Sequence, residues 1–114
     1  QFPEDLVLAG GLDLSVCRNL RTLPDDLVVK GDLGLRSCDK LECLPKRLSV
    51  AGKLNISRSP ITSIPSDLQI GGSLDMWHCE KLRHLPDGLT IDGFLVATNA
   101  GLEKLPQGLT VSGN

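Results

Sequence analysis

Aliphatic residues recur along the chain in columns spaced 20 or 21 residues apart. Each repeat starts at an aliphatic or aromatic residue followed by proline, and these starts fall at residues 2, 23, 44, 64, 85 and 105. After each proline come a leucine, a second aliphatic residue and then a glycine, and the glycines are Gly10, Gly31, Gly52, Gly72, Gly93 and Gly113. A fixed period near 20 with recurring aliphatic columns indicates a solenoid, in which each repeat forms one coil.

Each repeat contains two stretches in which aliphatic residues recur at every second position, such as Leu27-x-Val29 and Leu33-x-Leu35. This alternation predicts two short strands, each with one buried face. The glycine between them fits a turn with positive φ or a place where neighbouring backbones crowd. No repeat has the periodic length of an ordinary helix. We therefore predict one mainly β domain over residues 1–114, a solenoid of about five and a half coils with two short parallel strands per coil and little or no helix.

A further column follows the second strand of each repeat and holds Cys17, Cys38, Ser59, Cys79 and Ala100. Where cysteine is present the next leucine comes three residues later, and elsewhere the next aliphatic residue comes two later, which accounts for the two repeat lengths. We interpret these residues as small, inward-facing side chains with a local bend. Stacked cysteines would lie within disulfide range, but parallel side chains on neighbouring strands rarely meet the required torsion. We therefore expect free thiols in a reducing compartment.

The string L-x-L-x-x-C-x-x-L, at residues 12–20, 33–41 and 74–82, resembles the leucine-rich repeat, in which a strand is followed by an inward Asn or Cys. The short period and the recurring Leu-Pro resemble the bacterial subclass of secreted effectors of the IpaH and YopM type. The chain departs from that subclass in having one Leu-Pro per coil and a Cys or small residue in the inward column. The resemblance covers residues 2–113.

What the resemblance implies is a non-catalytic protein-binding module, the recognition domain of a larger effector that a bacterium secretes and that binds a host protein in the host cytoplasm. The IpaH-type relatives imply that a ubiquitin ligase domain can follow such a module in the parent protein. Inference from a fold family to a function is by analogy.

Several function classes have no support in the sequence. The formal net charge of −2 gives no basic field for nucleic acid, so we expect no nucleic-acid partner. No apolar run approaches the roughly 20 residues that span a bilayer, so we expect no membrane insertion. The segment MWHCEKLRHLP at 76–86 has two histidines and a cysteine, but no C-x-x-C pair or four-ligand spacing exists. We expect no metal, no cofactor and no catalytic residue, since nothing is placed to activate an inward thiol.

Residues between the aliphatic positions of the second strand are expected to face outward, and they vary between repeats. An outward Trp77 with charged and aromatic neighbours has the composition of an interface anchor. The alternative is that Trp77 folds over the sheet edge as a satellite hydrophobe. The candidate binding residues are Trp77, His78, Asp75, Arg36, Arg58, Asn55 and Phe94.

The repeat stays in phase from Phe2 to Gly113 without a capping helix. Solenoid ends need polar caps, so we expect the chain to join a longer protein or two copies to associate through the uncapped ends. The alternative function is therefore a structural spacer or self-association unit that forms a homodimer.

Overall fold

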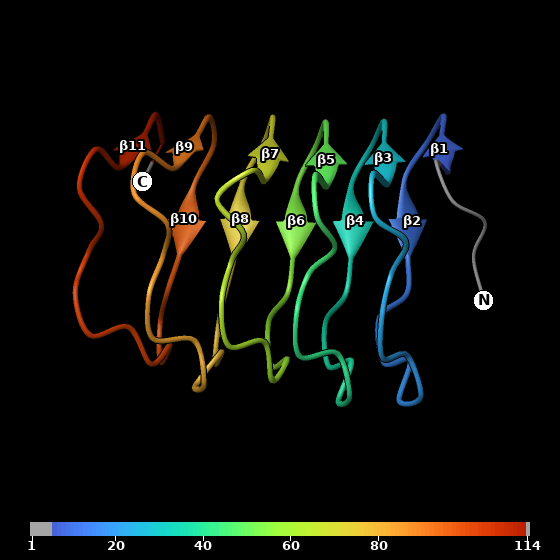
Figure 1. Ribbon diagram of the computed structural model, residues 1–114, viewed down its shortest axis with the longest axis horizontal. Coiled ribbons are helices and arrows are strands. Elements are labelled where there is room, and N and C mark those ends of the chain that lie inside the picture. The colour runs from blue at the N-terminus through green and yellow to red at the C-terminus, as the bar shows by residue number, and fades with distance from the viewer. Residues whose placement is uncertain (1–5, 114) are drawn as a thin grey trace.

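The computed structural model describes residues 6–113, which wind into a β-solenoid of stacked coils with no helix among them (Figure 1). The first strands of the coils are β1 (Val7–Leu8), β3 (Val28–Val29), β5 (Ser49–Val50), β7 (Gln69–Ile70), β9 (Thr90–Ile91) and β11 (Thr110–Val111). The second strands are β2 (Leu12–Asp13), β4 (Leu33–Gly34), β6 (Leu54–Asn55), β8 (Leu74–Asp75) and β10 (Leu95–Val96). These strands confirm the predicted mainly β solenoid. The repeat start at residue 2 lies outside the described residues.

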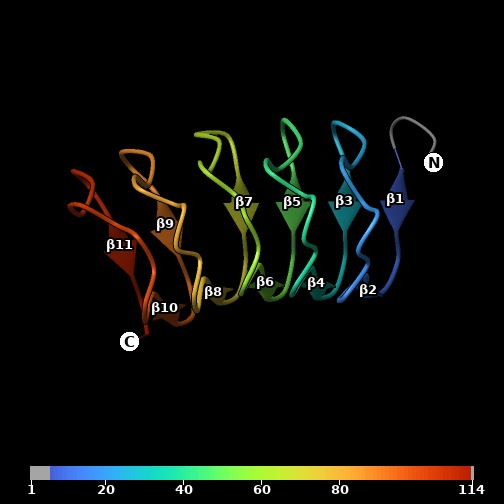
Figure 2. The same ribbon diagram turned by 90° about the horizontal axis from the view of Figure 1, so that it is seen from below.

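The strands stack in register from coil to coil, and every pairing is parallel. The second strands form one five-stranded sheet in the order β10-β8-β6-β4-β2, in which Leu33, Leu54 and Leu74 are aligned. The first strands form a four-stranded sheet, β1-β3-β5-β7, and a separate two-stranded sheet, β11-β9. Figure 2 shows the first strands in a row, with the second strands behind them. Equivalent residues of successive repeats therefore lie next to one another along the molecule.

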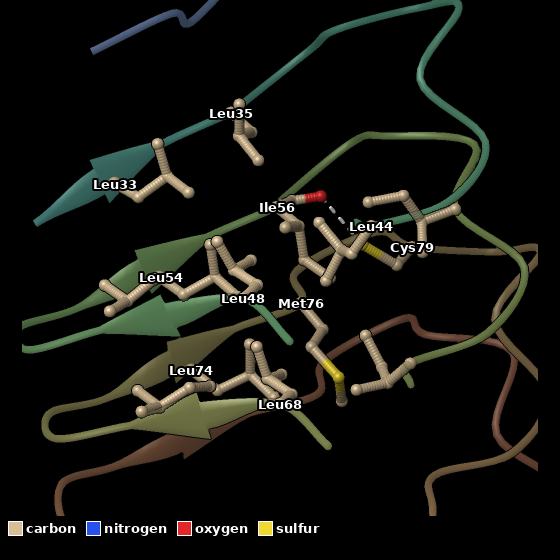
Figure 3. Close-up of a cluster of buried hydrophobic side chains, with 14 of the residues drawn as sticks. Leu33, Leu35, Leu44, Leu48, Leu54, Ile56, Leu68, Leu74, Met76 and Cys79 are labelled. Atoms are coloured by element: carbon tan, nitrogen blue, oxygen red, sulfur yellow. Dashed lines mark hydrogen bonds between the residues drawn. The ribbon is translucent and has the colours of Figure 1, made fainter. Parts of the chain in front are cut away.

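The core lies between the two rows of strands and is almost wholly aliphatic, as the low aromatic content requires. Figure 3 shows Leu33, Leu54 and Leu74 in one row, facing Leu48 and Leu68 of the first-strand side. Leu54 and Leu74 have no exposed surface. Equivalent residues of the end coils, such as Leu12 and Leu95, are only partly buried. Each coil is thus buried mainly by its two neighbours, as in other one-dimensional repeat folds.

The glycine column marks the closest approach of neighbouring backbones. Gly52 N donates to Gly31 O at 3.0 Å, Gly72 N to Gly52 O at 2.9 Å and Gly93 N to Gly72 O at 3.1 Å. None of these glycines has a positive φ, which among the described glycines occurs at Gly88 and Gly108. A Cβ on Gly72 would lie 2.8 Å from the carbonyl of Gly52. Crowding, and not backbone handedness, is therefore the reason for glycine in this column.

The inward column after the second strand forms a ladder of hydrogen bonds to the preceding coil. Cys38 Sγ donates to Leu14 O at 3.1 Å, Ser59 Oγ to Leu35 O at 2.9 Å and Cys79 Sγ to Ile56 O at 3.0 Å, the last drawn in Figure 3. Burial raises the pKa of the Cys38 and Cys79 thiols, so both remain protonated donors. The ladder therefore ties each strand end to the coil before it.

The two repeat lengths come from the turn that follows this ladder. Leu20 N donates to Cys17 O at 3.2 Å, and the same turn follows Cys38 and Cys79. In the shorter repeats, Pro60 and Gly101 follow the ladder residue directly, and a Cβ on Gly101 would lie 2.2 Å from Glu80 O. The predicted local bend after each ladder cysteine is confirmed.

We expect the four cysteines, all of them free, to react with a disulfide reagent at different rates. Cys43 is exposed and should react first, whereas buried Cys38 and Cys79 should react last because burial disfavours the thiolate. The measurement is the release of the coloured thiol at mildly alkaline pH, before and after unfolding in urea. Replacing Cys43 with serine should remove the fast phase, and a fast phase of undiminished amplitude in that variant would contradict the assignment.

Among the described turns that precede a first strand, the turn at Asp67 differs from the others in backbone conformation. Asp26 N donates to Lys46 O at 2.9 Å and Gly88 N to Gln107 O at 2.8 Å, and both donor residues have positive φ. Asp67, at the equivalent position, is not among the described residues with positive φ. Its turn leads into β7, after which the first-strand sheet is interrupted. Among the described coils, the strand pairing on the first-strand side is therefore missing between β7 and β9.

Candidate binding face

The candidate site is the side of the five-stranded sheet that faces away from the core, which we call the outer face. In each coil it carries three alternating residues, which we call the start, middle and end positions: the residue just before the second strand, the last residue of that strand and the residue two positions after it. In chain order they are Gly11, Asp13 and Ser15; Asp32, Gly34 and Arg36; Lys53, Asn55 and Ser57; Ser73, Asp75 and Trp77; and Phe94, Val96 and Thr98. Most are exposed or half-buried, and Ser57 is the buried exception.

The middle residues of three coils terminate the strand that carries them. Asp13, Asn55 and Asp75 each accept the backbone N–H two residues further on, at 3.0 Å. Asn and Asp favour this local bond, which mimics a backbone turn. Asn55 and Asp75 were predicted only as binding residues. In the structure their side chains also form the turn that ends the strand. The recurrence of Asn or Asp at one column is the sequence signal that points to it.

In all five of these coils, with or without such a turn, the residue three positions after the middle residue takes the left-handed backbone conformation. The φ angles are 62° at Val16, 57° at Ser37, 59° at Arg58, 57° at His78 and 57° at Asn99. Such a conformation costs an L-residue about 1–2 kcal/mol. Hydrogen bonds to the next coil offset the cost, as where Arg58 N donates to Trp77 O at 2.9 Å. The bend at these residues sets the direction in which Arg58 and His78 project.

Arg58, Trp77, His78 and Asn99 form a contiguous group across three coils, which we call the Trp77 cluster. The Arg58 guanidinium carbon lies 4.6 Å from the Trp77 ring centroid. The His78 ring stands edge-on to Trp77 with centroids 4.1 Å apart. Asn99 Nδ2 lies 3.1 Å from His78 Nε2, while Glu80 Oε2 is 3.6 Å from His78 Nδ1. The Trp77 ring thereby contacts both a cation and an imidazole.

The predicted binding residues are only partly gathered into one place. Trp77, expected to be exposed, is half-buried between its neighbours. Phe94 is 54% exposed and makes no ring contact with the Trp77 cluster among the contacts of the described residues. Arg36 and Asn55 line a different part of the face. The outer face therefore has an aromatic half, over β8 and β10, and a polar half, over β2, β4 and β6.

The polar half contains an open concavity of about 520 Å³, which we call the Gly34 hollow. Its lining includes the acidic Asp13 and Asp32, the basic Arg36 and Lys53, and the amide of Asn55. Hydrogen bonds from Ser15 lower the pKa of Asp13, so this carboxyl is ionised near neutral pH. No pattern in the sequence indicates the hollow, because it arises where glycines of two neighbouring coils leave space.

Within residues 6–113, no group of three or more potential metal-ligating side chains comes together. His84 lies away from His78, on the return segment of its coil, where its backbone bridges Ser63 and its ring lies 3.8 Å from Glu103. The described part of the chain has no helix long and apolar enough to cross a bilayer.

No family model matches this chain, and no curated protein and no solved structure matches it. The class that the structure defines is a β-solenoid repeat protein with short parallel coils.

Proposed function

We propose that the chain is a non-catalytic protein-binding module of the leucine-rich repeat type and that its outer face recognises a partner protein. The observation that supports this proposal is the contrast between the two sides of the second strands. The inward positions are almost all aliphatic, whereas the outward positions differ from coil to coil and include the Trp77 cluster and exposed Phe94. Tryptophan and arginine are the residues that most often dominate binding free energy at interfaces.

The pre-arranged geometry of the Trp77 cluster favours a role in recognition. Arg58 and His78 restrict the tryptophan ring, so less side-chain freedom is lost when a partner covers it. The ring keeps accessible surface, and exposed Phe94 offers a second apolar contact in the neighbouring coil. A partner surface with an apolar patch would bury both.

The string L-x-L-x-x-C-x-x-L and the hydrogen-bonded ladder at Cys38, Ser59 and Cys79 support the leucine-rich repeat assignment. By the same resemblance, the partner is a host protein met in the host cytoplasm by a secreted bacterial effector. Free thiols at all four cysteines suit such a reducing compartment. Any catalytic activity belongs to another domain of the parent protein.

The test is partner capture from host-cell lysate, followed by an affinity measurement with the captured protein. Replacing Trp77 and Arg58 with alanine should weaken binding at least about tenfold and leave thermal unfolding nearly unchanged. Gln69→Ala with Thr90→Ala, on exposed positions of β7 and β9, is the matched control and should bind normally. Unchanged affinity in the Trp77 variant would show that the Trp77 cluster takes no part in recognition.

Self-association is the second candidate, and Leu105 is the observation that favours it. Leu105 is 67% exposed, whereas Leu23, Leu44, Ile64 and Leu85 of the same column are 5–7% exposed. A second copy packed on this coil would bury Leu105. Sedimentation of the Leu105→Glu variant separates the candidates: a dimer that this variant dissociates supports self-association, and a monomer throughout excludes it.

A further inference from the structure

The Gly34 hollow exists because two outward positions lack side chains. The middle positions of the other second strands hold Asp13, Asn55, Asp75 and Val96, but β4 has glycine. Gly11 leaves a second gap at the start of the row that continues with Asp32 and Lys53. A Cβ on Gly34 would lie 2.8 Å from the Asp13 carboxylate and 3.2 Å from Ser15 Oγ. The hollow therefore has a backbone floor and a rim of charged side chains.

The two carboxylates on this rim are held in place by the fold. Asp13 Oδ1 accepts the Ser15 N–H at 3.0 Å, and Asp32 Oδ1 accepts the Lys53 N–H from the next coil at 2.8 Å. Among the described residues neither carboxylate forms a salt bridge. Each carboxylate thus has one oxygen bound to a backbone N–H, so its side chain has less freedom to lose when a cation binds.

The basic residues of the rim are not equivalent. Lys53 Nζ lies 3.9 Å from Asp75 Oδ2, so its charge is directed toward the neighbouring coil. Arg36 has no salt-bridge partner in the part of the chain that the structure describes. Asp32 comes directly before β4 and Arg36 two residues after it, so these residues stand at opposite ends of the hollow on either side of Gly34. Asp32 therefore makes one end of the hollow acidic and Arg36 makes the other basic. Asp13 also lines the hollow, and its pKa is lowered mainly by hydrogen bonds from Ser15 and to a smaller extent by the Arg36 charge.

We propose that the Gly34 hollow receives a basic side chain, lysine or arginine, of an extended peptide segment, and that an acidic side chain two residues away pairs with Arg36. The proposal deepens the function proposed above and rests on it, since it assigns the partner chemistry of the polar half of the outer face. Residues two apart in an extended peptide lie on the same side, about 6.6 Å apart, which matches the spacing from Gly34 to Arg36. An apolar segment would instead desolvate two carboxylates without replacing their water contacts.

The direct probe is the pentapeptide acetyl-Ala-Lys-Ala-Glu-Ala-amide together with its Glu-x-Lys reverse. We expect titration with at least one of them to shift the amide NMR signals of Ser15, Gly34, Arg36 and Lys53. A peptide with glutamine in place of both charged residues should leave these signals unmoved. The shifts should shrink as salt is raised from about 0.02 to about 0.5 M, because the contacts are exposed charge pairs. No shift with either charged peptide, or equal shifts with the glutamine peptide, would overturn the proposal.

Two variants separate the hollow from the rest of the face. Asp13→Asn with Asp32→Asn keeps an oxygen for each backbone N–H but removes both charges, and should weaken peptide binding at least about tenfold. Gly34→Asn fills the hollow with the residue type that other coils carry, and it should bind no peptide. Its Cβ would lie 2.8 Å from Asp13 Oδ1, so the Asp13 side chain must shift, and thermal unfolding of the variant checks that the coils remain stacked. Asp92→Asn, an exposed residue away from the hollow, is the control. Undiminished binding by Gly34→Asn would refute the proposal.

The same variants distinguish this inference from the proposed function. If the captured partner binds Gly34→Asn normally but not the Trp77 variant, the outer face recognises its partner without the hollow, and only the inference fails. If the partner binds both variants normally, the proposed function itself fails.

Discussion

Replacing Gly72 with alanine is expected to lower the free energy of unfolding by about 3 kcal/mol. The added Cβ would lie 2.8 Å from the carbonyl carbon and oxygen of Gly52 and 3.1 Å from Lys53 N. All these atoms belong to the backbone of the neighbouring coil, so the clash is relieved only by separating the coils. That separation stretches the Gly72–Gly52 hydrogen bond and the packing beneath it. Equilibrium unfolding in urea measures the loss.

Gly10→Ala is the matched control, because Gly10 occupies the same column but a Cβ there would meet no atom within 4 Å. We expect this substitution to change the free energy of unfolding by less than about 0.5 kcal/mol. Equal losses in the two variants would show that a backbone conformation unfavourable to any Cβ, and not contact between coils, explains glycine in this column.

Leu54→Ala is expected to destabilise the protein by about 3 kcal/mol, because it opens a cavity in the fully buried middle of the core. Leu54 pairs with Leu33 on one side and Leu74 on the other, so the loss affects the contacts of three coils. Thermal or urea unfolding measures the change.

The equivalent residue of the first described coil provides the comparison. Leu12 is only partly buried, and Leu12→Ala should cost about 1 kcal/mol. A loss at Leu12 as large as that at Leu54 would contradict the view that each coil depends on burial between two neighbours.

The repeat made most of the fold predictable from sequence. Each column is sampled several times, so the strands, the inward leucines and the ladder at Cys38 and Cys79 could be assigned from recurrence alone. The glycine column was also predicted, although sequence left open whether positive φ or crowding explains it. The structure shows that close approach of the neighbouring backbone is the reason at Gly31, Gly52, Gly72 and Gly93.

The candidate site was less predictable because it depends on what differs between coils. A left-handed backbone conformation is shared by Val16, Ser37, Arg58, His78 and Asn99. Their side chains have no chemistry in common, so no sequence pattern indicates this conformation. The stacking of Arg58 on Trp77 depends on side-chain conformations across two coils, which an alternating pattern does not specify. The hollow at Gly34 likewise depends on several neighbouring side chains at once.

The interruption between β7 and β9 has a mechanical consequence for the aromatic half of the outer face. On one side of the molecule the strand ladder stops there, while on the other side β8 and β10 remain paired. The molecule should therefore bend most easily between these two coils. The paired strands β8 and β10 act as the hinge, and the first strands β7 and β9 move apart. Trp77 and Phe94 belong to the two coils on either side of the joint. Such a bend would bring the two aromatic side chains closer together on the outer face, where both could contact a partner residue placed between them.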